Sequence, residues 1–224
     1  MHKIEVTENG PYLVTGGVPL LRVEIVTNAA GESVAWREIE RLDAGETYML
    51  CRCGASAIKP FCDGSHMSSG FDGTETAGHG KFAEIAANID GPGVRLQDAR
   101  KFCAEARFCD RAGGLWNLVK ECDDPALRAL VEEEAQLCPS GRYVVCDGHS
   151  HEAIEPELEI SIALIEDPFL EVSGPLWVRG GIAVQAADGT AYEVRNRVTL
   201  CRCGSSANKP FCDGGHVGAK FRDR

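Results

Sequence analysis

The chain has 224 residues, of which 44% are hydrophobic and 25% charged, a composition typical of a soluble globular protein with one large or two to three small domains. Its formal net charge of −11 argues against nucleic acid or an anionic membrane as its partner. No apolar run approaches the roughly 20 residues of a membrane-spanning helix, and the N-terminus matches neither a secretory nor an organelle-targeting signal. We therefore expect a cytoplasmic protein with no nucleic-acid or membrane partner.

The first fifty residues are expected to form short strands. They are rich in β-branched and aromatic residues and are interrupted by turn signals such as Gly16-Gly17. The expected strands are 12–14, 20–26, 33–39 and 46–50. The last strand leads directly into a cysteine-rich stretch.

This cysteine-rich stretch occurs twice. Residues 51–66 read CRCGASAIKPFCDGSH and residues 201–216 read CRCGSSANKPFCDGGH, with identity at thirteen of sixteen positions. Each copy offers three thiols and one imidazole, spaced C-x-C-x8-C-x3-H, which is a complete ligand set for one metal centre. The ligand candidates are Cys51, Cys53, Cys62 and His66 in the first copy, and Cys201, Cys203, Cys212 and His216 in the second. The eleven cysteines of the chain are an odd number, and a disulfide framework gives no reason for the His, so the pattern favours metal.

The repeat extends beyond the cysteines. Residues 10–18 (GPYLVTGGV) align with 174–182 (GPLWVRGGI), and Phe71 and Phe221 each follow the His by five residues. The second copy reaches its cysteines sooner, so we expect an insertion in the first copy, in a loop near residues 28–45. Units this small usually need a metal or a partner for stability.

The two copies are separated by a Gly-rich stretch and an insert expected to be helical. Residues 67–95 have linker composition. Apolar spacing predicts a helix over 96–112, and Asp124-Pro125 predicts the start of a second helix that ends at Pro139. Short strands are expected at 141–146 and 159–165. The expected domains are a first cluster unit (1–76), the helical insert (77–153) and a second cluster unit (154–224).

The spacing divides each ligand set into two pairs. Cys51 and Cys53 point the same way on an extended strand and can bind one iron. Cys62 and His66 fall on one face if a helical turn begins near Asp63. We expect Asp63 and Asp213 to cap these turns. Two ligands for each of two irons suit a dinuclear cluster.

The pattern C-x-C-x2-S-x3-P-x-C-D-G-x-H, present in both copies, resembles the CDGSH (NEET, mitoNEET-like) iron–sulfur domain family, with Gly215 standing where the family motif has Ser. The resemblance implies a 2Fe–2S cluster in each copy, held by the three Cys and one His named above. Single-motif members of the family dimerise through a shared β cap. We therefore expect an α+β fold in which two small β-rich units form a pseudo-twofold β cap within a monomer.

The ligand set also predicts a function. With three thiolates and a neutral His, a cluster is one unit less negative than with four thiolates, so its potential should exceed that of all-Cys ferredoxins. His is also the ligand for which protons compete near neutral pH, which predicts cluster loss in mild acid. We expect electron transfer or cluster transfer to redox or cluster-acceptor proteins that carry a basic docking patch.

Two alternatives use the same residues differently. Zinc suits three Cys and one His in a structural or interaction protein, and it would leave the protein colourless. A thiol enzyme could use an insert cysteine such as Cys109. However, the sequence has no nucleophile elbow, phosphate loop, dinucleotide fingerprint or paired-carboxylate signature, so we expect no enzyme.

The insert contains five further cysteines, Cys103, Cys109, Cys122, Cys138 and Cys146. Cys103-x5-Cys109 and Cys138-Pro139 resemble the opening and the closing Cys-Pro of a divergent single-cluster ferredoxin-like domain. A continuous helix would place Cys103 and Cys109 about 120° apart, so a third centre requires a break between them. Burial of these thiols in a helical core is the alternative.

Overall fold

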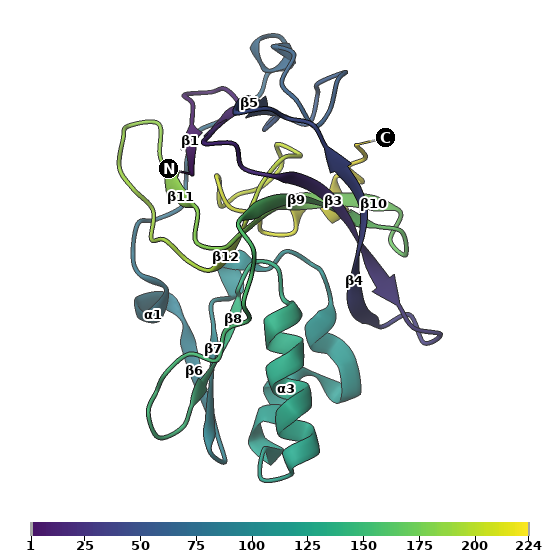
Figure 1. The fold of residues 1–224 in the computed structure, drawn as a ribbon, viewed down its shortest axis with the longest axis vertical. Helices are drawn as coiled ribbons and strands as arrows, with labels where there is room; N and C mark the ends of the chain where they lie inside the picture. Colours follow the sequence, from purple (N-terminus) through teal and green to yellow (C-terminus); the bar gives the residue numbers. More distant parts are fainter. Residues whose placement is uncertain (1, 224) are drawn as a thin grey trace.

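Two mixed sheets hold both copies of the repeat, with a third, smaller sheet and most of the helices in the insert. The computed structural model describes residues 2–223, and its fold is α+β, as expected (Figure 1). The first sheet has the order β11 (Ala183–Gln185), β1 (Lys3–Val6), β2 (Tyr12–Thr15), β5 (Thr47–Leu50). The second has the order β12 (Arg197–Leu200), β10 (Val172–Arg179), β9 (Ser161–Asp167), β3 (Leu20–Thr27), β4 (Ser33–Leu42).

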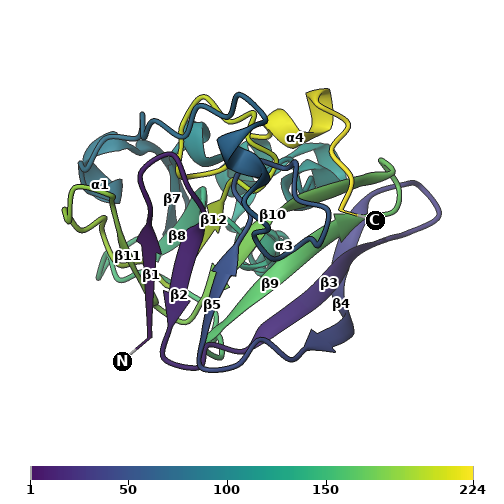
Figure 2. The same cartoon turned by 90° about the horizontal axis from the view of Figure 1, so that it is seen from above.

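Each of these sheets contains one strand from the other copy. β11 of the second copy pairs in parallel with β1, and β3 of the first copy pairs in parallel with β9, whereas the other neighbours are antiparallel. By sequence, β1, β2, β3 and β5 correspond to β9, β10, β11 and β12. The order β11-β1-β2-β5 is therefore repeated as β3-β9-β10-β12 (Figure 2). This exchange confirms the pseudo-twofold β cap.

The additional residues of the first copy form an extra edge strand. β4 pairs with β3 from Leu20↔Leu42 to Thr27↔Ser33, so the insertion near residues 28–45 is a hairpin with a long strand rather than a loop. Its Trp36 packs against Trp177 of β10 and Phe108 of the insert, with ring centroids 4.9 Å apart in both pairs. These contacts attach the insert to the face of the second sheet that carries Trp36 and Trp177.

The insert begins with α1 (Phe82–Ile85) and contains the small sheet β6 (Ala87–Gly91), β7 (Val94–Asp98), β8 (Tyr143–Asp147), together with α2 (Leu115–Leu118) and α3 (Pro125–Leu137). The helix expected over 96–112 is wrong. β7 buries Val94 and Leu96 and leaves Arg95 and Gln97 partly exposed, which is the period of a strand. The next residues form short 3-10 turns and a loop.

The second expected helix is confirmed as α3. The Asp124 carboxylate accepts a hydrogen bond from the Ala126 N–H at 2.8 Å, Pro125 occupies the first turn, and the helix ends before Pro139. None of the helices within residues 2–223 is long and apolar enough to span a membrane.

α3 also contains a buried carboxyl group, Glu134, that should make stability depend on pH. Burial raises its pKa from the ordinary value of 4.5 to about 7; it lies 3.4 Å from Arg111 Nε but accepts no hydrogen bond from a described residue. The folded state therefore binds this proton more tightly than the unfolded state. The stabilisation that proton binding gives is lost as pH rises through the folded-state pKa of about 7. We expect Glu134→Gln to raise the free energy of unfolding by about 1–2 kcal/mol at pH 8 and to change little at pH 4.

Denaturant titrations at both pH values measure this effect. Glu133→Gln is the control, since Glu133 is half exposed and pairs with the same Arg111 at 3.1 Å. Equal gains for both variants at pH 8 would contradict the assignment to the buried carboxyl group.

Candidate metal centres

In each copy, the chain folds back on the strand that carries the first cysteine. Cys51 follows β5, and its N–H donates to the Pro60 carbonyl at 2.8 Å, while the Cys62 N–H donates to the Met49 carbonyl at 2.9 Å. The second copy repeats both bonds, Cys201 to Pro210 at 2.8 Å and Cys212 to Thr199 at 2.9 Å. These bonds bring the third cysteine alongside the first two. The short turns 65–67 and α4 (Gly215–Gly218) then place the histidines.

The predicted ligands lie in pairs at the separations that a tetrahedral metal requires. The Sγ atoms of Cys51 and Cys53 are 3.5 Å apart and those of Cys201 and Cys203 are 3.7 Å apart; Cys62 Sγ to His66 Nδ1 is 3.4 Å, and Cys212 Sγ to His216 Nδ1 is 3.5 Å. Two ligands on one tetrahedral ion lie about 3.8 Å apart for two sulfurs and about 3.5 Å for sulfur and nitrogen, given bonds of about 2.3 and 2.0 Å.

The pairs do not merge into a site for a single ion. Within residues 2–223, no three Cys, His, Asp or Glu side chains converge on one position. The imidazoles present Nδ1 to the cysteines, so Nδ1 is the nitrogen available to a metal. The donor set therefore fits a centre with two metal ions, each bound by one pair.

Backbone N–H groups point at the cysteine sulfurs and favour their thiolate form. In the first copy, Ala55 N–H faces Cys53 Sγ and Gly64 N–H faces Cys62 Sγ, both at 3.4 Å. The second copy repeats them from Ser205 at 3.5 Å and Gly214 at 3.4 Å. Such hydrogen bonds stabilise negative charge on sulfur and raise the reduction potential of an iron–sulfur centre.

The aspartate that follows the third cysteine, Asp63 or Asp213, connects two segments of the motif within its own copy. Asp63 accepts from the Ser65 N–H at 2.9 Å and from the Ala57 N–H at 2.7 Å, and Asp213 does the same with Gly215 and Ala207. Hydrogen bonding by the Ser65 side chain, together with these backbone bonds, holds the pKa of Asp63 well below its ordinary value. The N-cap position itself is Gly64, at φ 87°, so the aspartates bind the first turn from one residue earlier than expected.

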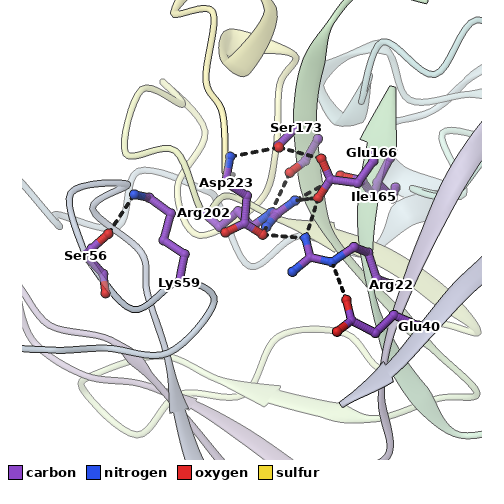
Figure 3. Close-up of polar contacts among 10 residues, drawn as sticks. Arg22, Glu40, Ser56, Lys59, Ile165, Glu166, Ser173, Arg202 and Asp223 are labelled. Carbon is purple, nitrogen blue, oxygen red and sulfur yellow. Dashed lines mark hydrogen bonds and ion pairs between the residues drawn. The ribbon is translucent and has the colours of Figure 1, made fainter. Parts of the chain in front are cut away.

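The lysines of the motif stabilise their own loops. Lys59 Nζ donates to the Ser56 carbonyl at 2.6 Å (Figure 3), and Lys209 Nζ donates to the Ser206 carbonyl at 2.8 Å. Lys209 also borders a hollow of about 370 Å³ that is lined by Cys53 of the first copy and Cys203 of the second. One of the two lysines thus reaches the seam between the copies.

A buried arginine that was not predicted from the sequence lies between the first two cysteines of each copy. Arg52 is 2% exposed and donates to the carbonyls of Thr7, Gly10 and Gly73 at 2.8–3.1 Å. Arg202 is 3% exposed and donates to the Gly174 carbonyl at 2.7 Å. Its sequence signal was available, because strand alternation turns the middle residue of C-R-C away from both cysteines, towards the core.

Arg202 additionally belongs to a buried charge cluster behind the second copy (Figure 3). Asp223 Oδ2 accepts from Arg202 at 2.5 Å and from Arg22 of β3 at 2.6 Å, and Glu166 accepts from the same two arginines. Burial raises the pKa of Asp223, but the two arginines outweigh it and hold the pKa below its ordinary value. The cluster thereby links the second ligand loop to a strand of the first copy.

Removing this carboxylate should destabilise the fold. Asp223→Ala leaves the buried guanidinium of Arg202 with Glu166 alone as carboxylate partner and that of Arg22 with Glu166 and Glu40, so we expect the free energy of unfolding to fall by about 3–5 kcal/mol. Denaturant unfolding measures the loss. Glu171→Ala is the control, because the exposed Arg222–Glu171 pair should contribute less than about 1 kcal/mol. Equal small losses would show that the cluster is not structurally important.

The two copies touch at their second cysteines. Cys53 and Cys203 form an isolated antiparallel bridge, and a Cβ atom on Gly54 would lie 2.7 Å from the Cys203 carbonyl oxygen. A Cβ atom on Gly204 would lie 2.8 Å from the Cys53 carbonyl oxygen. Both glycines also have positive φ. Only glycine therefore permits this close approach.

The ligands of the two copies differ in burial. Cys212 is 2% exposed and His216 4% exposed, whereas Cys62 and His66 are partly exposed. Burial, with the nearby Arg202, lowers the pKa of His216 to about 4, which keeps its imidazole neutral and free to bind metal. The hydrogen bond between Cys201 and Cys203 lowers the pKa of Cys201 to about 6 and raises the pKa of Cys203.

Three of the five insert cysteines also come together. Cys103, Cys109 and Cys138 line one small cavity, and the first two border an adjoining cleft of about 450 Å³. Cys122 and Cys146 lie elsewhere: the Cys122 thiol faces the Leu118 carbonyl at 3.7 Å, and the Cys146 thiol faces Gln97 Oε1 at 3.7 Å. All eleven cysteines are described, and none forms a disulfide.

The chain between Cys103 and Cys109 has the break that a third centre requires. Glu105 and Arg107 adopt φ values of 53° and 61°, which no helix allows. The loop thereby curls and directs Cys103 and Cys109 to the same cavity as Cys138, which lies at the end of α3.

Comparison with known families agrees with this arrangement of thiols. The family model described as iron-binding zinc finger CDGSH type matches residues 9–67 and 173–217, and the model described as divergent 4Fe-4S mono-cluster matches residues 89–148. The chain carries two CDGSH-type segments with a divergent 4Fe-4S segment between them. No curated protein and no solved structure matched.

The matched ranges contain all of the candidate ligands. The first and second CDGSH segments each include one complete set of three Cys and one His, and the divergent 4Fe-4S segment includes all five insert cysteines. The segments support an iron–sulfur protein, and the resemblance found in the sequence is confirmed in both CDGSH segments and in the insert.

Proposed function

We propose that each CDGSH segment binds one 2Fe–2S cluster. The single observation that carries this proposal is the division of each ligand set into a Cys–Cys pair and a Cys–His pair, separated by 3.4–3.7 Å. The first cluster would be held by Cys51, Cys53, Cys62 and His66, and the second by Cys201, Cys203, Cys212 and His216. A bound cluster of this type supplies one-electron redox chemistry.

The function supported best is that of a cytoplasmic monomer that transfers electrons or 2Fe–2S clusters to partner proteins. Cys62 and His66 are partly exposed, and the hollow at the seam reaches Cys53 and Cys203, so a partner can approach the ligands. The net charge of −11 favours a partner with a basic docking patch. Raised ionic strength should therefore weaken the association.

A thiol enzyme is supported less well. Burial raises the pKa of the thiols of Cys103, Cys109, Cys122 and Cys146 above its ordinary value. An activated catalytic cysteine requires the opposite shift. We therefore regard the chain as a carrier rather than an enzyme.

A second candidate function concerns the insert. The grouping of Cys103, Cys109 and Cys138 around one cavity favours a third centre, of the 4Fe–4S type, at these three thiols. The thiols of Cys103 and Cys109 donate to carboxylate oxygens of Glu105 and Asp110 at 3.3 and 3.6 Å, so these carboxylates are further candidate ligands. A four-iron cluster is a cube with ligands at its corners, so its thiolates need not converge on a single point.

One experiment tests the main proposal. Protein isolated without oxygen is assayed for iron, zinc and sulfide, and its visible absorption and electron paramagnetic resonance spectra are recorded. The holo protein is then incubated separately with an apo-ferredoxin and with a flavin reductase, to determine whether clusters or electrons move. A colourless protein containing zinc would overturn the proposal, whereas transfer in either assay would support it.

A further inference from the structure

The insert covers the second CDGSH segment and leaves the same surface of the first one open. Gly64 and Gly214 occupy equivalent positions, between the third cysteine and the histidine, with φ of 87° and 89°. A Cβ atom on Gly64 would meet nothing within 4 Å, but one on Gly214 would lie 2.5 Å from Cγ of Glu105. The Glu105 side chain therefore lies directly on the backbone between Cys212 and His216.

Contacts on both sides of Glu105 extend this cover. Lys101 accepts a hydrogen bond through its carbonyl from Asn208 Nδ2 at 3.1 Å. Phe102 packs edge-on against Phe211, with ring centroids 5.2 Å apart. The residue of the first copy that corresponds to Asn208 is Ile58, which is 57% exposed. In the second copy only, the covered surface thus extends from the loop that contains Asn208 and Phe211 to His216.

The covering loop is held in place. Arg107 forms a two-bond ion pair with Asp167, with N–O distances of 2.5 and 3.2 Å, and its guanidinium also donates to the Glu105 carbonyl at 3.1 Å. Asp167 is the last residue of β9, so the loop is fixed to the second sheet. The positive φ of Glu105 and Arg107 costs conformational energy that these contacts offset.

We propose that residues 101–107, hereafter the cap, close the Cys212–His216 side of the second CDGSH segment, so that the second cluster is retained while the first one is exchanged with acceptor proteins. This inference rests on the proposed function, since it assigns different roles to the two clusters proposed above. The partly exposed Cys62–His66 pair can be reached by a chelator or an acceptor thiol, whereas the cap excludes both from Cys212 and His216.

The side of the clusters that faces the hollow between the two copies does not produce this difference in access. The hollow at the seam is bordered by Cys53 and Cys203 alike, so any access through it is common to both clusters. Differences in the rate of cluster loss must therefore arise at the Cys–His pairs. The cap is the part of the insert that covers one of these pairs.

Single-cluster variants test the inference directly. Cys51→Ser with Cys62→Ser leaves only the second cluster, and Cys201→Ser with Cys212→Ser leaves only the first. Each is mixed with excess bathophenanthroline disulfonate or with an apo-ferredoxin, and loss of the CDGSH-type visible band is followed. We expect the first cluster to be lost at least about tenfold faster in both assays. Equal rates would overturn the inference.

Substitutions at the contact between the cap and the second CDGSH segment separate covering from general stability. In the variant that retains only the second cluster, Glu105→Ala and, independently, Asn208→Ile should each speed cluster loss several-fold, with no change in thermal unfolding of the apo protein. Neither should affect loss of the first cluster. Glu121→Ala is the control, because Glu121 is exposed and lies in a 3-10 turn that packs against β6, β7, α2 and α3 of the insert. If neither Glu105→Ala nor Asn208→Ile speeds loss of the second cluster, the inference is overturned.

The outcomes also separate this inference from the proposed function. If the unmodified protein contains no iron–sulfur cluster in its CDGSH segments, the proposed function fails and the inference fails with it. If both clusters are present and are lost at equal rates, the inference alone fails. Faster loss of the first cluster, together with acceleration of the second by Glu105→Ala, supports both.

Discussion

Exchange of both candidate histidine ligands for cysteine, in a His66→Cys, His216→Cys variant, should lower the midpoint potential of the proposed clusters by on the order of 100 mV or more. A fourth thiolate makes each cluster one unit more negative, so adding an electron costs more free energy. Spectroelectrochemical titration at constant pH measures the shift. The two single variants should each shift only one of the two clusters.

The control is the reciprocal exchange at the neighbouring position, Ser65→Gly and Gly215→Ser, which alters the motif without touching a ligand. We expect it to change the potential far less than the histidine exchange. Unchanged potentials in the double cysteine variant would contradict ligation by His66 and His216. Persistence of the visible band at pH 5 in the cysteine variant, and its loss in the parent protein, would add independent support, because protons compete with metal for imidazole.

The pairing of the candidate ligands could be predicted from the sequence because local spacing determines their geometry. Cys51 and Cys53 share a face of extended chain, and Cys62 and His66 share a short turn, and the pair distances follow from these two facts. A Cys–Cys or Cys–His pair has about the same separation on zinc as on iron, so the spacing of the motif could not distinguish the two metals.

The exchange of strands between the copies could not be predicted from local patterns. The Gly-Gly turns at 16–17 and 180–181 were visible, but nothing in β3 or β11 specifies which sheet it joins. That choice depends on parallel pairing with β9 and β1, which lie far away in the sequence. The duplicated sequence nevertheless indicated the symmetry, and the sheets follow it.

The fold of residues 96–112 could not be predicted from their apolar spacing, because that spacing has two sources. Leu96 is buried by strand alternation on β7, and Phe102 and Ala106 are buried by separate loop contacts with the second copy and with the sheet. Together they imitate a helix face. Because this spacing predicts a helix between Cys103 and Cys109, it predicts neither the thiol cavity nor the cap over Gly214.

A third centre would have its clearest signature in the iron count. If the insert binds a 4Fe–4S cluster, the protein contains about eight iron atoms per chain, against about four with CDGSH clusters alone. Cys138→Ser should then remove about four of them, because Cys138 supplies one of the three thiols at the cavity. The 2Fe–2S spectra should persist, since the CDGSH ligands are untouched.

Cys122→Ser is the matched control for this loss. Cys122 belongs to the same insert and is buried in its core, but its thiol faces the Leu118 carbonyl rather than the cavity. We expect it to retain the full iron content. Iron near four per chain in the unmodified, anaerobically isolated protein would assign Cys103, Cys109 and Cys138 to structure alone. An equal loss of iron in both variants would instead indicate that the insert had unfolded, and would contradict the specific role of Cys138 as a ligand.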